Sequence, residues 1–276
     1  MLCCGLSTVS NAAQPAVARL VAPGLCQLGE EWTPCTLISK EKASPDSTIF
    51  TFGLPDTSKP LLLSTCAAIL ARGGAAKDVI RPYTPVSTNA LTGRFQLLVK
   101  VYPDGKLSQY MQALEPGAAL DFKHIAANVK LQYPFGKARI GMIAGGTGIT
   151  PCLQTLHALL GTAMDTTRVS LLYGARTEAD VLAKSTLDAW AVTYKERFNV
   201  TYVLSAEPEG SSWKGERGHI NAERVKQRLP APTDDCLILL CGPPPMYAAL
   251  CGARTEPELT GVLAGLGFRA EQVYKF

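Results

Sequence analysis

The chain has 276 residues, which suggests about two domains at a usual size of ~150 residues each. Hydrophobic residues make up 47% of it and charged residues 18%, a composition that excludes an intrinsically disordered protein. The 27 basic and 23 acidic residues give a net charge of +4, too small and dispersed to indicate nucleic-acid binding but suited to a transient partner with an acidic face.

The first 29 residues contain one basic residue, Arg19, and no acidic residue. A lack of acidic residues is one feature of organelle transit peptides, so residues 1–30 are expected to be a targeting segment or a disordered start. Glycines and a proline interrupt the long uncharged stretch 140–164, and no transmembrane span is predicted. Nine cysteines without a Cys-x-x-Cys pair indicate neither a disulfide framework nor structural zinc, and no metal site is predicted.

The first half of the chain is dominated by short strand patterns. Strands are expected within 36–52, 94–102, 118–124 and 129–133, and a short helix over 106–114. This pattern predicts a barrel-like domain over residues 31–135.

The second half alternates strand and helix patterns. Strands are expected at 139–144, 169–173, 198–204 and 236–240, and helices at 151–160, 178–197, 222–229 and 256–266. Such alternation predicts a doubly wound α/β domain over residues 136–276.

Two motifs lie where strands of the second half end. Residues 140–151, IGMIAGGTGITP, lead from a strand through a glycine-rich turn into a helix, where main-chain N–H groups can approach a phosphate. A purely structural turn is the alternative. Residues 241–246, CGPPPM, follow a strand at the edge of the sheet where ligands bind in such folds, although Cys241 could also be a small buried hydrophobic residue.

Two further motifs lie in the first half. RPYTP, residues 81–85, offers a guanidinium, an aromatic ring and a hydroxyl in one extended segment, unless it is an ordinary edge strand. GKLS, residues 105–108, precedes a helix and suits an anion, unless Ser108 is only a helix cap. Anion sites in both halves suggest two phosphate-bearing ligands that meet between the domains.

Six ordered motifs together resemble the ferredoxin reductase superfamily, and within it the NADH–cytochrome b5 reductase family, most of all its mitochondrial members. They are RPYTP, KVY followed by GKLSQY, GMIAGGTGITP, LLYG, CGPPPM and VYKF. The resemblance covers residues 32–276. It implies an α+β two-domain fold, with a six-stranded antiparallel FAD-binding β-barrel followed by a doubly wound parallel α/β NAD-binding domain.

The resemblance implies a flavoprotein oxidoreductase that takes a hydride from NADH onto FAD and passes single electrons to cytochrome b5 or a similar acidic haem protein. One alternative is a ferredoxin- or flavodoxin-type NADPH reductase with another electron acceptor. A second alternative is a nucleotide-binding module without catalysis. A monomer is expected, located in the mitochondrion or otherwise in the cytoplasm. The basic residues expected to receive an acidic partner are Lys100, Lys106, Lys123, Lys130 and Lys137.

The resemblance also implies a set of site residues. Those expected to bind FAD are Arg81, Pro82, Tyr83, Thr84, Val99, Lys100, Tyr102, Gly105, Lys106, Leu107 and Ser108. Those expected beside the flavin and the dinucleotide are Gly145, Gly146, Thr147, Gly148, Thr150, Cys241, Gly242, Pro243, Pro244, Met246 and Phe276. Thr84 and Cys241 are expected to act in catalysis, Thr84 near the reactive flavin nitrogen and Cys241 near the reacting nicotinamide carbon.

The chain departs from the family pattern at the expected adenosine ribose. Ser205 stands where an Asp commonly receives the ribose hydroxyls, and Ser cannot repel a ribose phosphate as Asp would. Glu207 is the other candidate for that role. Leu107 replaces a usual Met, and residues 122–130 replace a usual Gly-Pro turn.

Overall fold

The computed structural model describes residues 21, 25–74, 76–125 and 131–276. Most of the predicted targeting segment, together with Lys130, therefore lies outside the described residues. The chain divides into two compact units, one formed by the chain up to Pro134 with Leu153–Ala163, the other by Phe135–Cys152 with Met164–Phe276. Within the described ranges, no helix is both long and apolar enough to cross a membrane.

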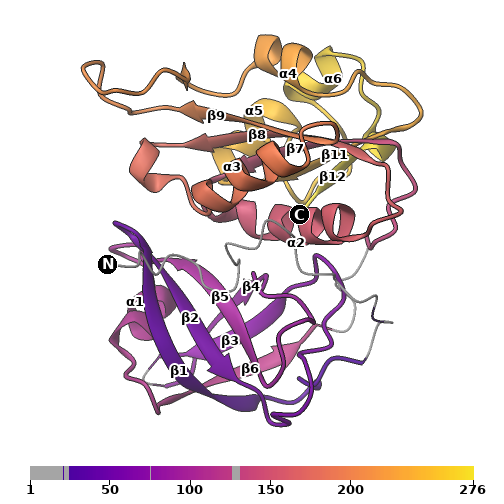
Figure 1. Cartoon of the computed structure of the whole chain (residues 1–276). Coiled ribbons are helices and arrows are strands. Elements are labelled where there is room, and N and C mark those ends of the chain that lie inside the picture. Colours follow the sequence, from indigo (N-terminus) through magenta and orange to yellow (C-terminus); the bar gives the residue numbers. More distant parts are fainter. Residues whose placement is uncertain (1–20, 22–24, 75, 126–130) are drawn as a thin grey trace. The chain divides into compact units, whose positions relative to one another are not determined.

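The first unit is built on the expected six-stranded antiparallel sheet, with the order β4-β3-β6-β1-β2-β5 (Figure 1). Its elements are β1 (Thr33–Ser44), β2 (Ser47–Gly53), β3 (Ile69–Gly73), β4 (Val79–Tyr83), β5 (Arg94–Lys100), α1 (Lys106–Ala113) and β6 (Ala119–His124). Beyond β4, the Val86 N–H donates to the Gln96 carbonyl on β5 at 2.9 Å. This bond links the chain after one edge strand to the other edge strand, as a barrel requires.

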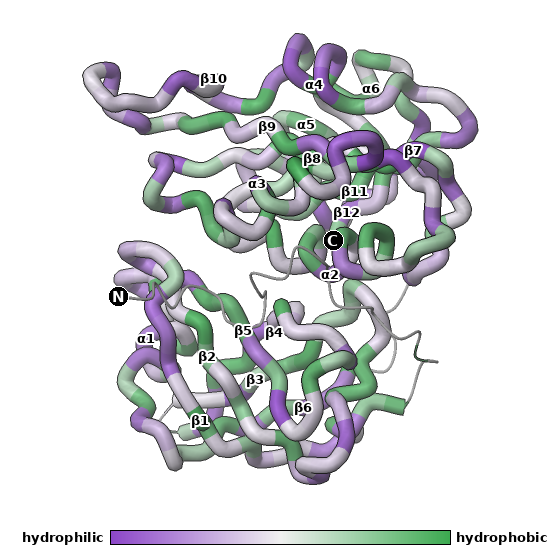
Figure 2. The backbone as a smooth tube through the Cα atoms, in the orientation of Figure 1, coloured by the Kyte–Doolittle hydropathy of each residue, from purple (hydrophilic) through white to green (hydrophobic). Residues whose placement is uncertain are grey.

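Apolar side chains that alternate along these strands form the core of the first unit (Figure 2). Phe52 packs against Phe95 and Phe122, with ring centroids 5.8 and 4.8 Å apart. Because neighbouring residues of a strand point to opposite faces, one face of the sheet supplies this aromatic cluster. The strand expected over 129–133 is wrong for residues 131–133, which form a bend before Pro134 and before Gly136 with φ +63°.

The second unit holds a parallel sheet with the order β10-β9-β8-β7-β11-β12. Its strands are β7 (Arg139–Gly145), β8 (Arg168–Ala175), β9 (Phe198–Leu204), β10 (Glu216–Arg217), β11 (Cys236–Cys241) and β12 (Val273–Lys275). The chain runs outward from β7 to β10 and then returns to the other side of β7 for β11. The strand order therefore reverses between β7 and β11, the point where ligands bind in open α/β sheets.

Helices connect these strands, as the alternating pattern predicts. They are η1 (Gly146–Gly148), α2 (Ile149–Gly161), η2 (Glu178–Asp180), α3 (Lys184–Thr193), α4 (Ala222–Arg228), α5 (Pro244–Leu250), α6 (Gly261–Gly265) and η3 (Ala270–Gln272). Buried residues of α4, α5 and α6, such as Val225, Leu250 and Leu263, share one cluster with the sheet residues Ile143 and Leu240.

Two predicted helices are shorter in the structure. The expected helix 178–197 is divided into η2 and α3 by Ala183, whose φ of +56° is left-handed. The expected helix 256–266 begins only at Gly261. The Lys275 ammonium group donates to the carbonyls of Glu256 and Glu258, which are thus not engaged in a regular helix.

Candidate functional site

The loops after β7 and β11 meet at the point where the strand order reverses, and we call residues 145–148 and 241–246 the switch-point cradle. A Cβ atom on Gly148 would lie 2.1 Å from the Cys241 carbonyl oxygen. A Cβ atom on Gly145 would lie 2.7 Å from the Met246 methyl carbon. At Gly148, whose neighbours are main-chain atoms, only glycine allows this approach, so the two loops pack directly against each other. The Met246 thioether packs against Gly145 and Gly242.

The β7 loop of the cradle presents main-chain N–H groups. Gly146 adopts φ +54°, Gly146–Gly148 form a 3-10 turn, and α2 begins directly afterwards. From β8, the Tyr173 hydroxyl donates to the Gly146 carbonyl at 3.0 Å and accepts the Leu182 N–H at 3.2 Å. The turn is thus fixed from the neighbouring strand, with the positive end of a helix dipole beside it, an arrangement suited to a phosphate. Thr150 is buried in the first turn of α2, and Thr147 is half-buried.

Cys241 ends β11 opposite Ala144 of β7 and is half-buried. Burial raises the pKa of its thiol to about 11, although hydrogen bonding with Tyr247 offsets part of this rise. The thiol is therefore neutral at neutral pH and cannot serve there as a thiolate nucleophile. Pro243 and Pro244 follow on the surface, where they form a stiff segment without N–H donors as α5 begins.

The last residue of the sequence lies beside the cradle. The Phe276 N–H donates to the Leu240 carbonyl at 3.0 Å. In the β11–β12 register, Leu240 pairs with Lys275, so Phe276 comes level with Cys241. The Phe276 ring packs edge-on against Tyr274, with centroids 4.9 Å apart. The structure thus brings a thiol and an aromatic ring to the carboxyl ends of neighbouring strands.

At the end of β9, Ser205 is exposed, and both its N–H and its hydroxyl donate to the Ala175 carbonyl, at 3.0 and 3.3 Å. The Glu207 carboxylate accepts the Glu178 N–H at 2.7 Å. Glu207 is therefore engaged at the start of η2. The end of β9 therefore carries Ser205, and no carboxylate, at the position where an Asp is usual.

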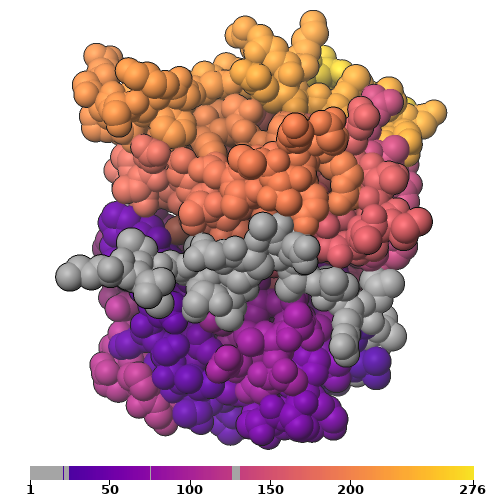
Figure 3. All heavy atoms as spheres, in the orientation of Figure 1, coloured from indigo at the N-terminus to yellow at the C-terminus, as the bar shows by residue number. Residues whose placement is uncertain are grey.

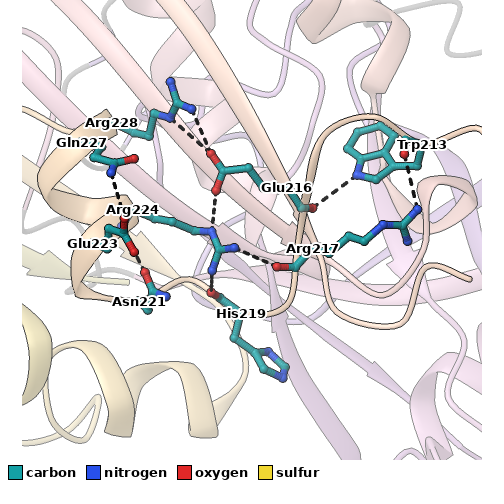
Figure 4. A network of polar contacts seen from close by, with 9 residues as sticks. All are labelled: Trp213, Glu216, Arg217, His219, Asn221, Glu223, Arg224, Gln227 and Arg228. Atoms are coloured by element: carbon teal, nitrogen blue, oxygen red, sulfur yellow. Dashed lines mark hydrogen bonds and ion pairs between the residues drawn. The ribbon is translucent and has the colours of Figure 1, made fainter. Parts of the chain in front are cut away.

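A network that the sequence analysis missed fixes the loop after Ser205, which projects from the sheet edge in orange (Figure 1). The atoms of this part of the chain are drawn in orange in Figure 3. The Glu216 carboxylate pairs with both Arg224 and Arg228 of α4 (Figure 4). Arg217 donates to the Glu207 carbonyl at 2.7 Å and to the Ser211 hydroxyl at 3.0 Å. The only sequence signal was the spacing of Arg224 and Arg228, which places both on one face of a helix.

In the first unit, β4 presents two of the predicted residues on one face. Arg81 pairs with Ala71 and Tyr83 with Ile69 in the β3–β4 register, and Pro82 points to the other side. The Arg81 guanidinium is exposed and donates to the neighbouring Ile80 carbonyl at 2.7 Å. This is its only hydrogen bond to another of the described residues. Burial raises the pKa of Tyr83 to about 12, partly offset by the nearby charge of Arg81. The half-buried Thr84 follows at the end of the strand.

In the same unit, a side chain from the segment Leu153–Ala163 hydrogen-bonds to the residues that follow Thr84. The Gln154 side-chain amide donates to the carbonyls of Pro85 and Ser87, at 2.7 and 2.8 Å. Gln154 is a second residue that the sequence analysis missed. A helical pattern of apolar residues does not reveal that a buried side-chain amide will hydrogen-bond to distant main-chain carbonyls. Its two bonds fix the end of RPYTP.

The start of α1 holds the predicted residues Gly105, Lys106, Leu107 and Ser108. Leu107 and Ser108 are only 2% and 5% exposed. The Ser108 hydroxyl donates to the Gly105 carbonyl at 3.1 Å and accepts the Tyr102 N–H at 3.3 Å. Gly105, and not Ser108, is the N-cap. These residues therefore offer main-chain N–H groups and the exposed Lys106 to an anion, not the serine hydroxyl.

Val99 and Lys100 end β5, which precedes this helix in the chain. Val99 is buried in the core, and Lys100 pairs with Asp46. The Lys100 ammonium also lies 5.9 Å from the ring centroid of the exposed Tyr102. Each unit thus carries its own set of features suited to a phosphate, and the second adds a thiol and an aromatic ring.

Comparison with known proteins agrees with this geometry. Residues 34–133 match the family described as oxidoreductase FAD-binding domain, and residues 142–252 match oxidoreductase NAD-binding domain. The chain is 40% identical over 254 residues to NADH-cytochrome b5 reductase 2 of Scheffersomyces stipitis, covering 90% of this chain and 84% of the relative. It is 38% identical to the NADH-cytochrome b5 reductase-like protein of Arabidopsis thaliana, covering 90% and 77%.

A solved structure shares both the fold and much of the sequence. The cytochrome b5 reductase domain of Ulva prolifera nitrate reductase superposes with a TM-score of 0.77 at 32% identity. The match covers 94% of this chain and all of that domain.

Proposed function

The chain belongs to the NADH-cytochrome b5 reductase family, and we propose that it takes electrons from NADH onto FAD and passes them singly to cytochrome b5 or a similar acidic haem protein. The switch-point cradle is the observation on which this proposal rests most directly. Its glycines leave room for a dinucleotide at the carboxyl ends of β7 and β11, with Cys241 at the strand end.

The first unit fits FAD on the chemistry of its donors. Arg81 is exposed and forms no ion pair among the described residues, so its guanidinium is available for a pyrophosphate. The first turn of α1 adds main-chain N–H groups from Lys106, Leu107 and Ser108. Tyr83, which lies near both Arg81 and Tyr102, supplies a ring for the isoalloxazine and ribityl parts together with Tyr102, with Val99 and Lys100 at the end of β5.

When bound, FAD accepts two electrons from NADH and releases them one at a time, which neither a nicotinamide nor a haem can do alone. The residues of this chain hold and orient the reactants and exclude water. Gly145, Gly146, Thr147, Gly148 and Thr150 bind the dinucleotide, and Gly242, Pro243, Pro244 and Met246 support the nicotinamide half. The neutral Cys241 thiol positions the nicotinamide ring, Phe276 lies beside it, and Thr84 hydrogen-bonds the flavin.

Among the lysines proposed to receive the haem protein, the described ones differ in their surroundings. Lys106 is exposed at the start of α1. Lys123 lies 4.9 Å from the Trp32 ring centroid, and Lys137 donates to the Asp234 carbonyl at 2.6 Å. Lys106 is therefore the most accessible positive charge of this set near the proposed FAD site.

The finer assignments complete the proposal. We infer an FAD domain over 31–135, an NAD domain over 136–276 and a monomer. Residues 1–30 direct the chain to mitochondria, an inference supported by their lack of acidic residues up to Gly29. A fluorescent fusion that carries residues 1–30 tests the last point by its location.

The decisive test of function is reduction of cytochrome b5 by the purified FAD-loaded protein with NADH. We expect rapid haem reduction that depends on enzyme concentration and is faster than with ferredoxin or flavodoxin as acceptor. Preferred reduction of ferredoxin with NADPH would support the alternative type of reductase instead. A purified protein that neither retains nor rebinds FAD would overturn the proposal altogether.

A further inference from the structure

Tyr247 lies in α5, next in sequence to Met246 of the cradle, and is 3% exposed. Its hydroxyl donates to the main-chain oxygen of Phe276, at 2.7 Å. The Leu240 carbonyl lies farther away, at 3.2 Å, and already accepts the Phe276 N–H. The hydroxyl has one proton, so its principal bond is the one to Phe276.

Phe276 is thus fixed on both sides of its main chain, by Leu240 through its N–H and by Tyr247 through its oxygen. The Tyr247 side chain also lies near the Cys241 thiol, whose pKa it lowers. The hydrogen bond of its buried hydroxyl, however, goes to Phe276.

The rest of β12 does not depend on Tyr247. The Gln272 side chain, just before the strand, donates to the Thr233 carbonyl at 2.6 Å. Lys275 donates to the carbonyls of Ala253, Glu256 and Glu258, at 2.9 to 3.1 Å. The strand has its own anchors up to Lys275, and the Tyr247 bond acts on Phe276 alone.

We propose that Tyr247 is a positioning residue that holds Phe276, and with it the Phe276 ring, in place at the nicotinamide end of the cradle. This inference rests on the proposed function, which assigns Cys241 and Phe276 to that end. Tyr247 touches neither reactant and acts through Phe276.

The variant Tyr247→Phe removes the hydroxyl and keeps the ring. We expect the Phe276 amide to exchange its hydrogen about 3- to 10-fold faster, the factor equivalent to one neutral hydrogen bond. The amides of Tyr274 and Lys275 keep their protection, because their anchors remain. Amide exchange followed by nuclear magnetic resonance on the FAD-loaded protein measures this without any turnover.

Stopped-flow reduction of the flavin by NADH supplies the second readout. We expect the limiting rate to fall by about 3- to 10-fold while NADH affinity and FAD content change little. The matched control is Tyr202→Phe, which removes a tyrosine hydroxyl bonded at the same distance of 2.7 Å, to Asp188 on α3. This control is expected to leave both the Phe276 amide and the reduction rate unchanged.

The outcomes separate the two proposals. Unchanged exchange at Phe276 would overturn the positioning role, whatever the enzyme does with NADH. Faster exchange with a wild-type reduction rate would also overturn it, since the ring position would then not matter. If the wild-type flavin is not reduced by NADH at all, the proposed function fails, whereas the exchange data still report on the bond.

Discussion

Replacement of Gly148 by alanine tests the switch-point cradle at its tightest contact. The added Cβ would lie 2.1 Å from the Cys241 carbonyl oxygen and 2.5 Å from its carbonyl carbon. Both neighbours are main-chain atoms, so no flexible side chain can move aside. Contacts of a Cβ below 3.0 Å are essentially never seen, so the two loops must separate by about 0.9 Å.

Such a separation has two measurable effects. A misplacement of about 1 Å near reacting groups can slow a reaction by about 100-fold, and the rate of flavin reduction by NADH should fall toward that limit. Overpacking of this kind costs about 1–3 kcal/mol, which corresponds to a melting temperature lower by roughly 2–10 °C. FAD content should persist, because Gly148 lies outside the first unit.

Gly265→Ala is the matched control. Its Cβ would meet no atom within 4 Å, and the residue lies in α6 with an ordinary φ. Alanine in a helix is favoured over glycine by about 0.5–1 kcal/mol, so this variant should melt slightly higher and reduce its flavin normally. Wild-type stopped-flow kinetics in Gly148→Ala would refute the view that the close approach of the two loops shapes the NADH site.

Three further substitutions test individual roles. Arg81→Ala should weaken FAD binding by roughly 1.5–3 kcal/mol, the value of one charge-assisted contact, measured by flavin titration of the apoprotein; unchanged affinity would remove Arg81 from the pyrophosphate site. NADH should outperform NADPH in the wild type, and Ser205→Asp should lower kcat/KM for NADPH several-fold further, because an anion repels the ribose phosphate; identical NADPH kinetics would place residue 205 away from the ribose. Cys241→Ser keeps the size but adds a better-hydrated group, so flavin reduction should slow more than NADH binding weakens; a normal rate would mean that the thiol only packs.

The spacing of apolar and polar residues predicted the strands well, because residues that are buried in a fold must be apolar at regular positions along each strand or helix. The apolar residues of 94–100 and 139–145 are long runs with clear turns after them, and both strands appear as expected. Helix ends were predicted less well. The helix expected from Glu256 begins at Gly261, and the carbonyls of Glu256 and Glu258 accept hydrogen bonds from the distant Lys275 side chain instead.

The motifs located the candidate site, but the contacts that hold it were not visible in the sequence. Glycines and prolines mark the cradle directly, since their backbone properties are local. The roles of Tyr173, Gln154 and Tyr247 depend on hydroxyl or amide groups that meet main-chain atoms far along the chain. Ser108 shows the converse, because a local motif suggested a ligand hydroxyl and the structure engages that hydroxyl with Gly105 and Tyr102.

Anaerobic titration of the purified protein with NADH, followed by its absorption spectrum, tests the central claim most directly. We predict a yellow protein with about one FAD per chain, whose visible flavin bands bleach in proportion to added NADH and return when cytochrome b5 is added in its oxidised form. A flavin spectrum that NADH leaves unchanged, or bands that do not return with oxidised cytochrome b5, would contradict the account.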